Sequence, residues 1–244
     1  MESANVVGYN TAAITGGQMN LLCVSWETVG NTQGKATLND VMDISVLTSY
    51  DVDEGDYIQT WDMANGNWGP KYFYVDKGTD PDWGSEYANT WMDGNFVPCN
   101  PAIDPGSAFW LYANNTIADF KFKGQVSAAG TAYTLTAGCM NLCANPYPAV
   151  LNLNDKSQVV LTGMTSYGDE EGDYIQTWDL TTGNWGPKYF YVDQGSNPDW
   201  GPEYADTWMN GAYEPVATTA IPAGTGFWYY ANAAVTLTFT SPVN

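Results

Sequence analysis

The chain contains no arginine and no histidine, and its only basic side chains are seven lysines against 27 acidic residues. The net charge of −20 repels the phosphates of nucleic acids and of anionic membranes, so we expect neither as a partner. Without histidine, Ser-His-Asp and Cys-His nucleophilic sites and histidine-ligated zinc are excluded. Carboxylate pairs of the glycosidase type remain open. We expect that the protein is not an enzyme.

Long apolar runs are also missing. No stretch approaches the roughly 20 apolar residues that cross a bilayer, so no membrane insertion is expected. The first residues, Met1–Asn5, have neither the basic region nor the apolar core of a signal peptide. The composition is nevertheless rich in tryptophan, tyrosine, glycine, asparagine and threonine. This favours a secreted, extracellular or cell-surface protein whose signal has been removed.

What the chain does contain is a tandem duplication. Residues 55–94 and 172–211 are identical at 31 of 40 positions, at a constant offset of 117. Weaker matches join 15–23 to 136–144 and 105–115 to 222–233. The repeat predicts two homologous domains that abut without a linker, residues 1–124 (the first repeat) and 125–244 (the second repeat). Two near-identical modules favour a binding array or a polymer over a single active site.

Apolar and polar residues alternate along each repeat, which is typical of half-buried strands. The clearest hairpin joins Tyr57–Trp61 to Trp68–Val75 through an Asn-Gly turn. A first strand is expected over Val6–Ile14 and a short helix within Thr37–Ile44. About six to eight short strands in each unit predict an all-β protein of two tandem, homologous small β-sandwich or β-barrel domains.

Eleven tryptophans and seventeen tyrosines have two interpretations. Aromatic residues fill small β cores, and most of these tryptophans recur in both repeats. Alternatively, some form a stacking platform for sugars, and Trp83 and Trp200 are the best candidates because they lie in loops. A secreted tandem carbohydrate-binding module, with a glycan as partner, is therefore the alternative function.

An acidic run precedes the hairpin in both repeats. Several carboxylates around a glycine turn suit calcium, which takes six to eight oxygen ligands. The run is not an EF-hand, because a strand follows it instead of a helix. The alternative is an exposed acidic turn that helps solubility. Calcium is the only candidate cofactor, and its candidate ligands are Asp53, Glu54, Asp56, Glu170, Glu171 and Asp173.

The four cysteines, Cys23, Cys99, Cys139 and Cys143, are candidates for a disulfide. If 139–143 is an extended strand, its ends lie ~13 Å apart. A disulfide needs about 6 Å between Cα atoms, so a Cys139–Cys143 pair is disfavoured. Pairing with Cys23 or Cys99 stays open, as does the alternative of free buried thiols.

Several short motifs resemble a group of secreted, poorly characterised β-repeat proteins of planctomycete- and verrucomicrobia-type bacteria. The similar segments are the N-terminal Ser3–Tyr9, the strand Met19–Leu21, the tryptophan hairpin Ile58–Trp68 and the closing motif Pro105–Trp110. The resemblance implies an exported β protein. It implies no catalytic residues, and the cysteines are not part of it.

The junction between the repeats indicates a route to self-assembly. Phe120–Lys123 runs through Gly124 into the second repeat, so the end of one repeat leads into the start of the next. If the N-terminus of another copy took the place of residues 125–130, copies would stack head-to-tail as a filament. The alternative is that Ala4–Ile14 pairs within its own repeat. A structural subunit of an extracellular filament, with the protein itself as partner, is the first functional prediction. Its expected interface residues are Ala4, Asn5, Val6, Val7, Gly8, Tyr9, Leu237, Phe239 and Val243.

Overall fold

The structure, a computed structural model, describes residues 6–30, 36–50, 55–76, 83–168, 172–193, 195 and 200–243. Over these residues the chain is a set of antiparallel sheets with one four-residue helix, α1 (Leu38–Val41), and none of the sheets closes into a barrel. The predicted all-β class is confirmed. No helix in the described part of the chain is long and apolar enough to cross a membrane.

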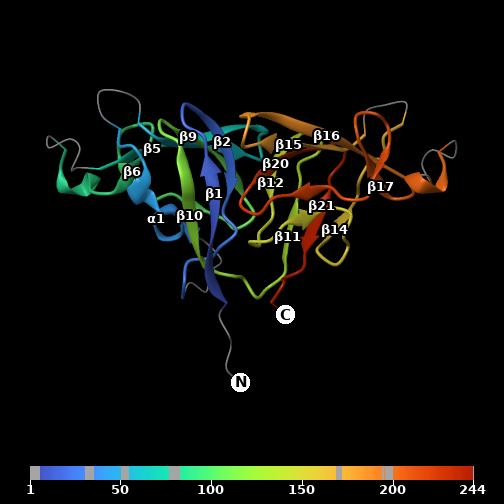
Figure 1. Cartoon of the computed structure of the whole chain (residues 1–244), viewed down its shortest axis with the longest axis horizontal. Helices are drawn as coiled ribbons and strands as arrows, with labels where there is room; N and C mark the ends of the chain where they lie inside the picture. The colour runs from blue at the N-terminus through green and yellow to red at the C-terminus, as the bar shows by residue number, and fades with distance from the viewer. Residues whose placement is uncertain are drawn as a thin grey trace, which may run out of the picture.

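The first repeat has two layers. Its larger sheet has the strand order β2-β9-β4-β5-β6-β7, and it packs over the β1-β10 pair and α1 (Figure 1). The bounds are β1 (Val7–Ile14), β2 (Gln18–Cys23), β3 (Ala36–Thr37), η1 (Ile44–Val46), β4 (Tyr57–Asp62), β5 (Asn67–Val75), η2 (Ser85–Tyr87), β6 (Thr90–Met92), β7 (Pro98–Cys99), β8 (Ala102–Ile103), β9 (Ala108–Ala113) and β10 (Ile117–Gln125).

The second repeat has the same plan. Its six-stranded sheet, β12-β20-β15-β16-β17-β18, packs over the sheet β11-β21-β14. The bounds are β11 (Thr131–Thr134), β12 (Cys139–Ala144), β13 (Leu151–Asn152), β14 (Val159–Thr162), β15 (Tyr174–Asp179), β16 (Asn184–Val192), η3 (Pro202–Tyr204), β17 (Thr207–Met209), β18 (Pro215–Val216), β19 (Ala220–Ile221), β20 (Gly226–Ala231) and β21 (Thr236–Phe239).

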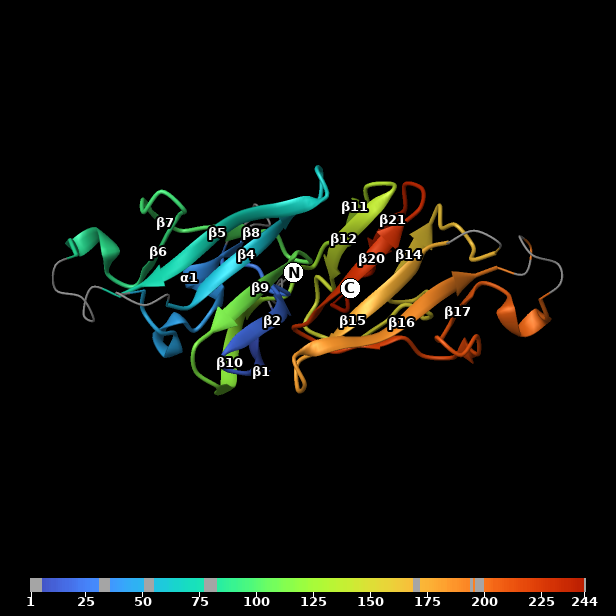
Figure 2. The same cartoon turned by 90° about the horizontal axis from the view of Figure 1, so that it is seen from above.

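Strand alternation separates the two faces of each six-stranded sheet. On β4 and β9, Ile58, Phe109 and Leu111 are fully buried against the strand pair below. Their neighbours Tyr57 and Trp110 therefore point to the opposite face, because successive side chains of a strand alternate. This outer face is the one seen from above in Figure 2.

The two repeats contact each other reciprocally. Trp61 of the first repeat packs edge-to-face on Trp228 of the second at 4.6 Å between ring centroids. Trp178, the counterpart of Trp61, packs edge-to-face on Trp110, the counterpart of Trp228, at 4.8 Å between ring centroids. Two side-chain hydrogen bonds repeat this exchange, from Thr15 Oγ1 to the Leu180 carbonyl and from Thr136 Oγ1 to the Met63 carbonyl. The same patch is used on both sides, so the contact closes on itself.

Within the chain, this geometry differs from a head-to-tail arrangement of the repeats, whereas head-to-tail contacts between copies of the chain stay a prediction. A heterologous contact would place different surfaces of the two repeats together, and a reciprocal contact does not propagate. The predicted strand over Val6–Ile14 is found as β1, paired with β10 inside its own repeat. Pairing within the repeat was the alternative to strand exchange.

The C-terminal strand is unavailable to another subunit. β21 is hydrogen-bonded on one edge to β11 and on the other to β14. Leu237 and Phe239, predicted at an interface, are instead 0% and 1% exposed in the core of the second repeat. They are corrected to core residues.

The two ends of the described chain lie beside each other. The Val6 carbonyl accepts a hydrogen bond from the Val126 amide, and Ser241 Oγ donates to the Ser127 carbonyl. Both ends are thus fixed to the same connection between the repeats, and the half-buried Val243 lies close by. Ala4 and Asn5 lie outside the described residues.

Candidate functional site

An aromatic pocket lies at the far end of the first repeat. It has a volume of about 300 Å³ and is lined by Tyr50, Trp83, Gly84, Tyr87, Met92 and Phe96. Trp83, singled out from the sequence, is half-buried here, and its ring stacks on Tyr50 at 6.1 Å and 16°. The sequence pattern alone did not identify the partner rings of Trp83, since they come from separate loops.

Phe96 gives this pocket an exposed wall. Its side chain is 55% exposed, and its backbone is left-handed at φ 62°. A bulky residue rarely adopts this conformation, which costs about 1–3 kcal/mol and is found most often at functional sites. The Tyr87 hydroxyl donates to the Phe96 carbonyl at 3.1 Å and so holds the turn. The ring is presented to solvent by a fixed backbone.

The second repeat contains the same constellation. Trp200 stacks on Tyr167 at 6.3 Å and 12°, and Tyr204 packs on Trp200 as Tyr87 packs on Trp83. Tyr213 takes the place of Phe96, with φ 63° and an exposed fraction of 56%. The Tyr204 hydroxyl donates to the Tyr213 carbonyl at 2.9 Å. The strained backbone and the exposed ring are therefore both duplicated, although the residue changes.

A carboxylate accompanies each pocket. The Glu86 side chain folds back over Gly84, where a Cβ atom would collide with its carboxylate oxygens, and Glu203 lies over Gly201 in the same way. Glycine at 84 and 201 is what leaves room for the carboxylate. In each repeat a carboxylate thus lies beside the aromatic cluster, next to the glycine that follows the tryptophan.

The two aromatic clusters lie at opposite ends of the molecule. The short helical turns that carry Tyr87 and Tyr204, η2 and η3, are at the two extremes of the long axis in Figure 1 and Figure 2. A single chain therefore presents two matching aromatic clusters, one at each end of the molecule.

The two described residues of the predicted calcium cluster have structural roles. Asp56 is 1% exposed, and its carboxylate accepts hydrogen bonds from the backbone amides of Thr48 and Asn114. Asp173 is 0% exposed and accepts from the Asn232 amide and the Tyr229 hydroxyl. Burial raises the pKa of both carboxyl groups, and the hydrogen bonds oppose that rise.

These hydrogen bonds give the two recurring aspartates a structural role in both repeats. Among the described residues, no group of three or more acidic or cysteine side chains is placed to hold a metal ion. The other four candidates, Asp53, Glu54, Glu170 and Glu171, lie outside the described residues.

All four cysteines are free thiols in the structure. Cys23 and Cys143 are buried, whereas Cys99 and Cys139 are half-buried. Burial raises the pKa of Cys23 to about 12 and raises that of Cys143 further still. Both buried thiols are therefore protonated and unreactive at neutral pH. No disulfide joins any of the candidate pairs.

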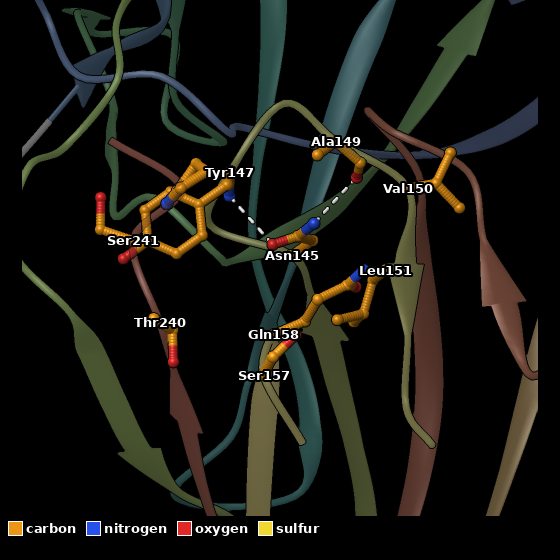
Figure 3. Close-up of a pocket in the computed structure, with 10 residues that line it drawn as sticks. Asn145, Tyr147, Ala149, Val150, Leu151, Ser157, Gln158, Thr240 and Ser241 are labelled. Carbon is orange, nitrogen blue, oxygen red and sulfur yellow. Dashed lines mark hydrogen bonds between the residues drawn. The ribbon is translucent and has the colours of Figure 1, made fainter. Parts of the chain in front are cut away.

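A further pocket of about 260 Å³ opens near the end of β21 in the second repeat (Figure 3). Asn145 lines it but uses its side chain within its own loop, donating to the Ala149 carbonyl and accepting from the Tyr147 amide. In the first repeat, Gln125 pairs with Glu27 through two backbone hydrogen bonds. Pro242 stands at the position of Gln125 and cannot donate, so the edge stays open. This pocket therefore follows from a local difference in pairing.

Comparisons of the chain with protein-family models, with curated proteins and with solved structures each found no match. The resemblance to secreted β-repeat proteins of planctomycete- and verrucomicrobia-type bacteria stays a prediction that rests on the short motifs alone. The function must be argued from the sites.

Proposed function

We propose that the protein is a bivalent glycan-binding module of the lectin type, acting outside the cell. The observation that carries this proposal is the duplicated aromatic cluster, in which an exposed ring is held by a left-handed backbone at both ends of the molecule. Core packing accounts for Tyr50 and Met92. It does not account for Phe96 and Tyr213, which are more than half exposed.

The chemistry of the pockets fits a neutral sugar. The C–H face of a sugar ring packs on the electron-rich face of an aromatic ring, and its hydroxyl groups donate to a carboxylate such as Glu86. The net charge of −20 disfavours sulfated or phosphorylated glycans and nucleic acids. Two equivalent sites on one chain also increase avidity for a surface with many copies of the same sugar.

The test is binding to an array of neutral glycans by the wild type and by a Trp83→Ala, Trp200→Ala double variant. Binding should be lost in the double variant and weakened in each single variant, because avidity needs both ends. The matched control is Tyr9→Ala, which removes an exposed aromatic ring on β1, away from both the pockets and their tryptophans. If no neutral glycan binds the wild type, or if the double variant binds equally well, the proposal is wrong.

A filament subunit is the second candidate function, and one observation favours it. The first residues of β1 expose large apolar side chains, with Val7 at 59% and Tyr9 at 69%, and Val29 beside them is 61% exposed. Together they border a surface hollow with Gly8 and Lys123. Exposed apolar side chains that cluster in this way are typical of a protein–protein contact. The contact would use this patch, since β21 has no free edge.

Electron microscopy of the secreted protein tests the second candidate. Filaments in the wild type that are lost in a Val7→Ser, Tyr9→Ser variant would support assembly through the patch. Dispersed two-lobed particles in the wild type would contradict it. Repeating the measurement with a calcium chelator tests whether calcium, the candidate cofactor, contributes.

A further inference from the structure

A tryptophan-lined groove lies where the two repeats meet, on the outer face of the six-stranded sheets. It has a volume of about 450 Å³, and five tryptophans line it: Trp68, Trp110, Trp178, Trp185 and Trp228. Trp68 and Trp185 are 56% and 48% exposed, whereas Trp110 is 4% exposed. The groove thus has a buried floor and two exposed tryptophans, one from each repeat.

Two indole groups of the groove lack a partner. The Nε1–H groups of Trp110 and Trp178 have no hydrogen-bond acceptor within the described part of the chain. Both nitrogen atoms are buried, and a buried donor without an acceptor costs about 1–3 kcal/mol, so a movement of the indole rings that brings a ligand oxygen to these donors would be favourable. A sugar hydroxyl supplies such an oxygen.

The reciprocal contact between the repeats is not symmetric in the hydrogen bonds of its two equivalent tryptophans, Trp61 and Trp178. Trp61, the counterpart of Trp178, donates its Nε1–H to the Met140 carbonyl at 3.1 Å. Trp178 does not make the matching hydrogen bond to Met19, which lines the groove instead. The unpaired donor and the groove therefore lie on the same side of the contact between the repeats.

A series of aromatic rings connects the end pocket of the first repeat to this central groove. In the first repeat Trp83, Tyr50, Phe73, Tyr57 and Tyr112 follow one another, with neighbouring ring centroids 5.1 to 6.1 Å apart. Tyr57 also lines the groove. The second repeat repeats the series with Trp200, Tyr167, Phe190, Tyr174 and Tyr230. We call these two series and the groove between them the aromatic track.

We propose that the aromatic track binds one extended neutral polysaccharide chain, with the tryptophan groove as its central subsite. This inference rests on the proposed function and specifies its ligand as a long chain that lies across both repeats. The first series reaches the groove at Tyr57, where the Lys71 ammonium lies 3.5 Å from the ring centroid, and the rings of both series are half-buried. A short oligosaccharide would occupy only one end pocket.

The experiment is calorimetric titration with cello-, xylo-, manno- and chito-oligosaccharides of increasing length. For the wild type, affinity should rise with chain length, and the stoichiometry should change from two short ligands to one long ligand for each protein. The double variant Trp68→Ala, Trp185→Ala should lose at least about tenfold in affinity for long chains and keep its affinity for short ones. The double variant Trp68→Phe, Trp185→Phe, which keeps the rings, should bind long chains nearly as well as the wild type.

A second readout reports on the groove itself. In a ¹⁵N-labelled protein, the indole N–H signals of Trp110 and Trp178 should shift on addition of long chains and not of short ones. If short and long chains bind with equal affinity and the groove variants have no effect, the central subsite is wrong while glycan binding stands. If no oligosaccharide binds, the proposed function fails and the track fails with it.

Discussion

The six-stranded sheets of the two repeats match closely, whereas the layers beneath them differ. β4 and β5 pair in the same register as β15 and β16, with the same irregularity before the tryptophan. Below them, β1 has eight residues and β11 has four, and the second repeat has the strand β14 where the first has the single bridge between Met42 and Phe122. The two halves have therefore kept their upper sheets and changed their lower layers.

This difference indicates which constraint has kept the upper sheets of the two repeats similar. A core needs only the right volume and apolar character, so the lower layers can vary and still pack. The upper sheets have an outer face whose aromatic residues recur together with their ring geometry. Packing alone does not require that, whereas a ligand that contacts the same face of both repeats does.

The largest expected effect is the difference in unfolding free energy between a buried and an exposed tryptophan variant of the groove. Trp110→Ala removes a ring that is 4% exposed at the contact between the repeats. It should lower the free energy of unfolding by about 3–5 kcal/mol, while Trp68→Ala should lower it by about 1 kcal/mol or less. Urea unfolding followed by circular dichroism measures both free energies. Equal losses would contradict the assignment of Trp110 to the buried floor of the groove and of Trp68 to its exposed edge.

The two buried aspartates sharpen the comparison of the repeats. Asp56→Ala should lower the unfolding free energy by about 2 kcal/mol, because buried backbone donors lose their acceptor. Asp173→Ala should lower it by about 1 kcal/mol more, since the buried Tyr229 hydroxyl also loses its acceptor. In the first repeat, Leu111 occupies the position that corresponds to Tyr229. If adding Tyr229→Phe to Asp173→Ala makes the loss of unfolding free energy equal to that of Asp56→Ala, the difference between the repeats is due to the Tyr229 hydroxyl.

A smaller effect tests the asymmetry of the groove. Trp61→Phe loses the hydrogen bond to the Met140 carbonyl and should cost about 1 kcal/mol more than Trp178→Phe, which loses none. The two variants remove the same atoms from equivalent positions, so each is the control of the other. Equal unfolding free energies would mean that the two sides of the contact are alike.

The smallest expected effect is a pH dependence. The pKa values of Asp56 and Asp173 are raised above the usual 3.8 by burial, so the folded state binds their protons more tightly than the unfolded state. The unfolding free energy should therefore fall as the pH rises from about 4 through these raised values. Asp62 and Asp179, with lowered pKa values, act in the opposite sense and only at pH values below 3.8.

An Asp56→Asn, Asp173→Asn variant provides the control for this pH dependence. It should have a flatter pH profile above pH 4 than the wild type, because the two titrating groups are gone. An unchanged slope would assign the dependence to the general charge of −20 instead.

Local patterns predicted the strands well. The hairpin expected from Tyr57–Trp61 and Trp68–Val75 is found as β4 and β5, because strict alternation and an Asn-Gly turn fix both register and turn. The helix expected within Thr37–Ile44 is found only as Leu38–Val41. Thr37 is its N-terminal cap by position, but its hydroxyl donates to the Asp40 carboxylate and does not cap a backbone amide.

Contacts between distant segments were not predictable in this way. Trp83 and Trp200 were identified as ligand candidates from their loops, but Tyr50 stacks on Trp83 from 33 residues earlier in the chain. The aromatic residues at 96 and 213, each two residues after a glycine in a duplicated turn, were the available signal for the exposed rings. The reciprocal contact depends on pairs such as Trp61 and Trp228, which no local pattern relates.

Because both repeats belong to one chain, their sequences can evolve separately. In a homodimer of a single repeat, every substitution appears at two symmetry-related places, so a groove on one side would always have a twin on the other. Here one gene product carries both halves, and Cys139 can stand where the first repeat has Gln18. Each half is thus free to acquire its own substitutions, and a pair of identical outer sites can be combined with a central site that exists once.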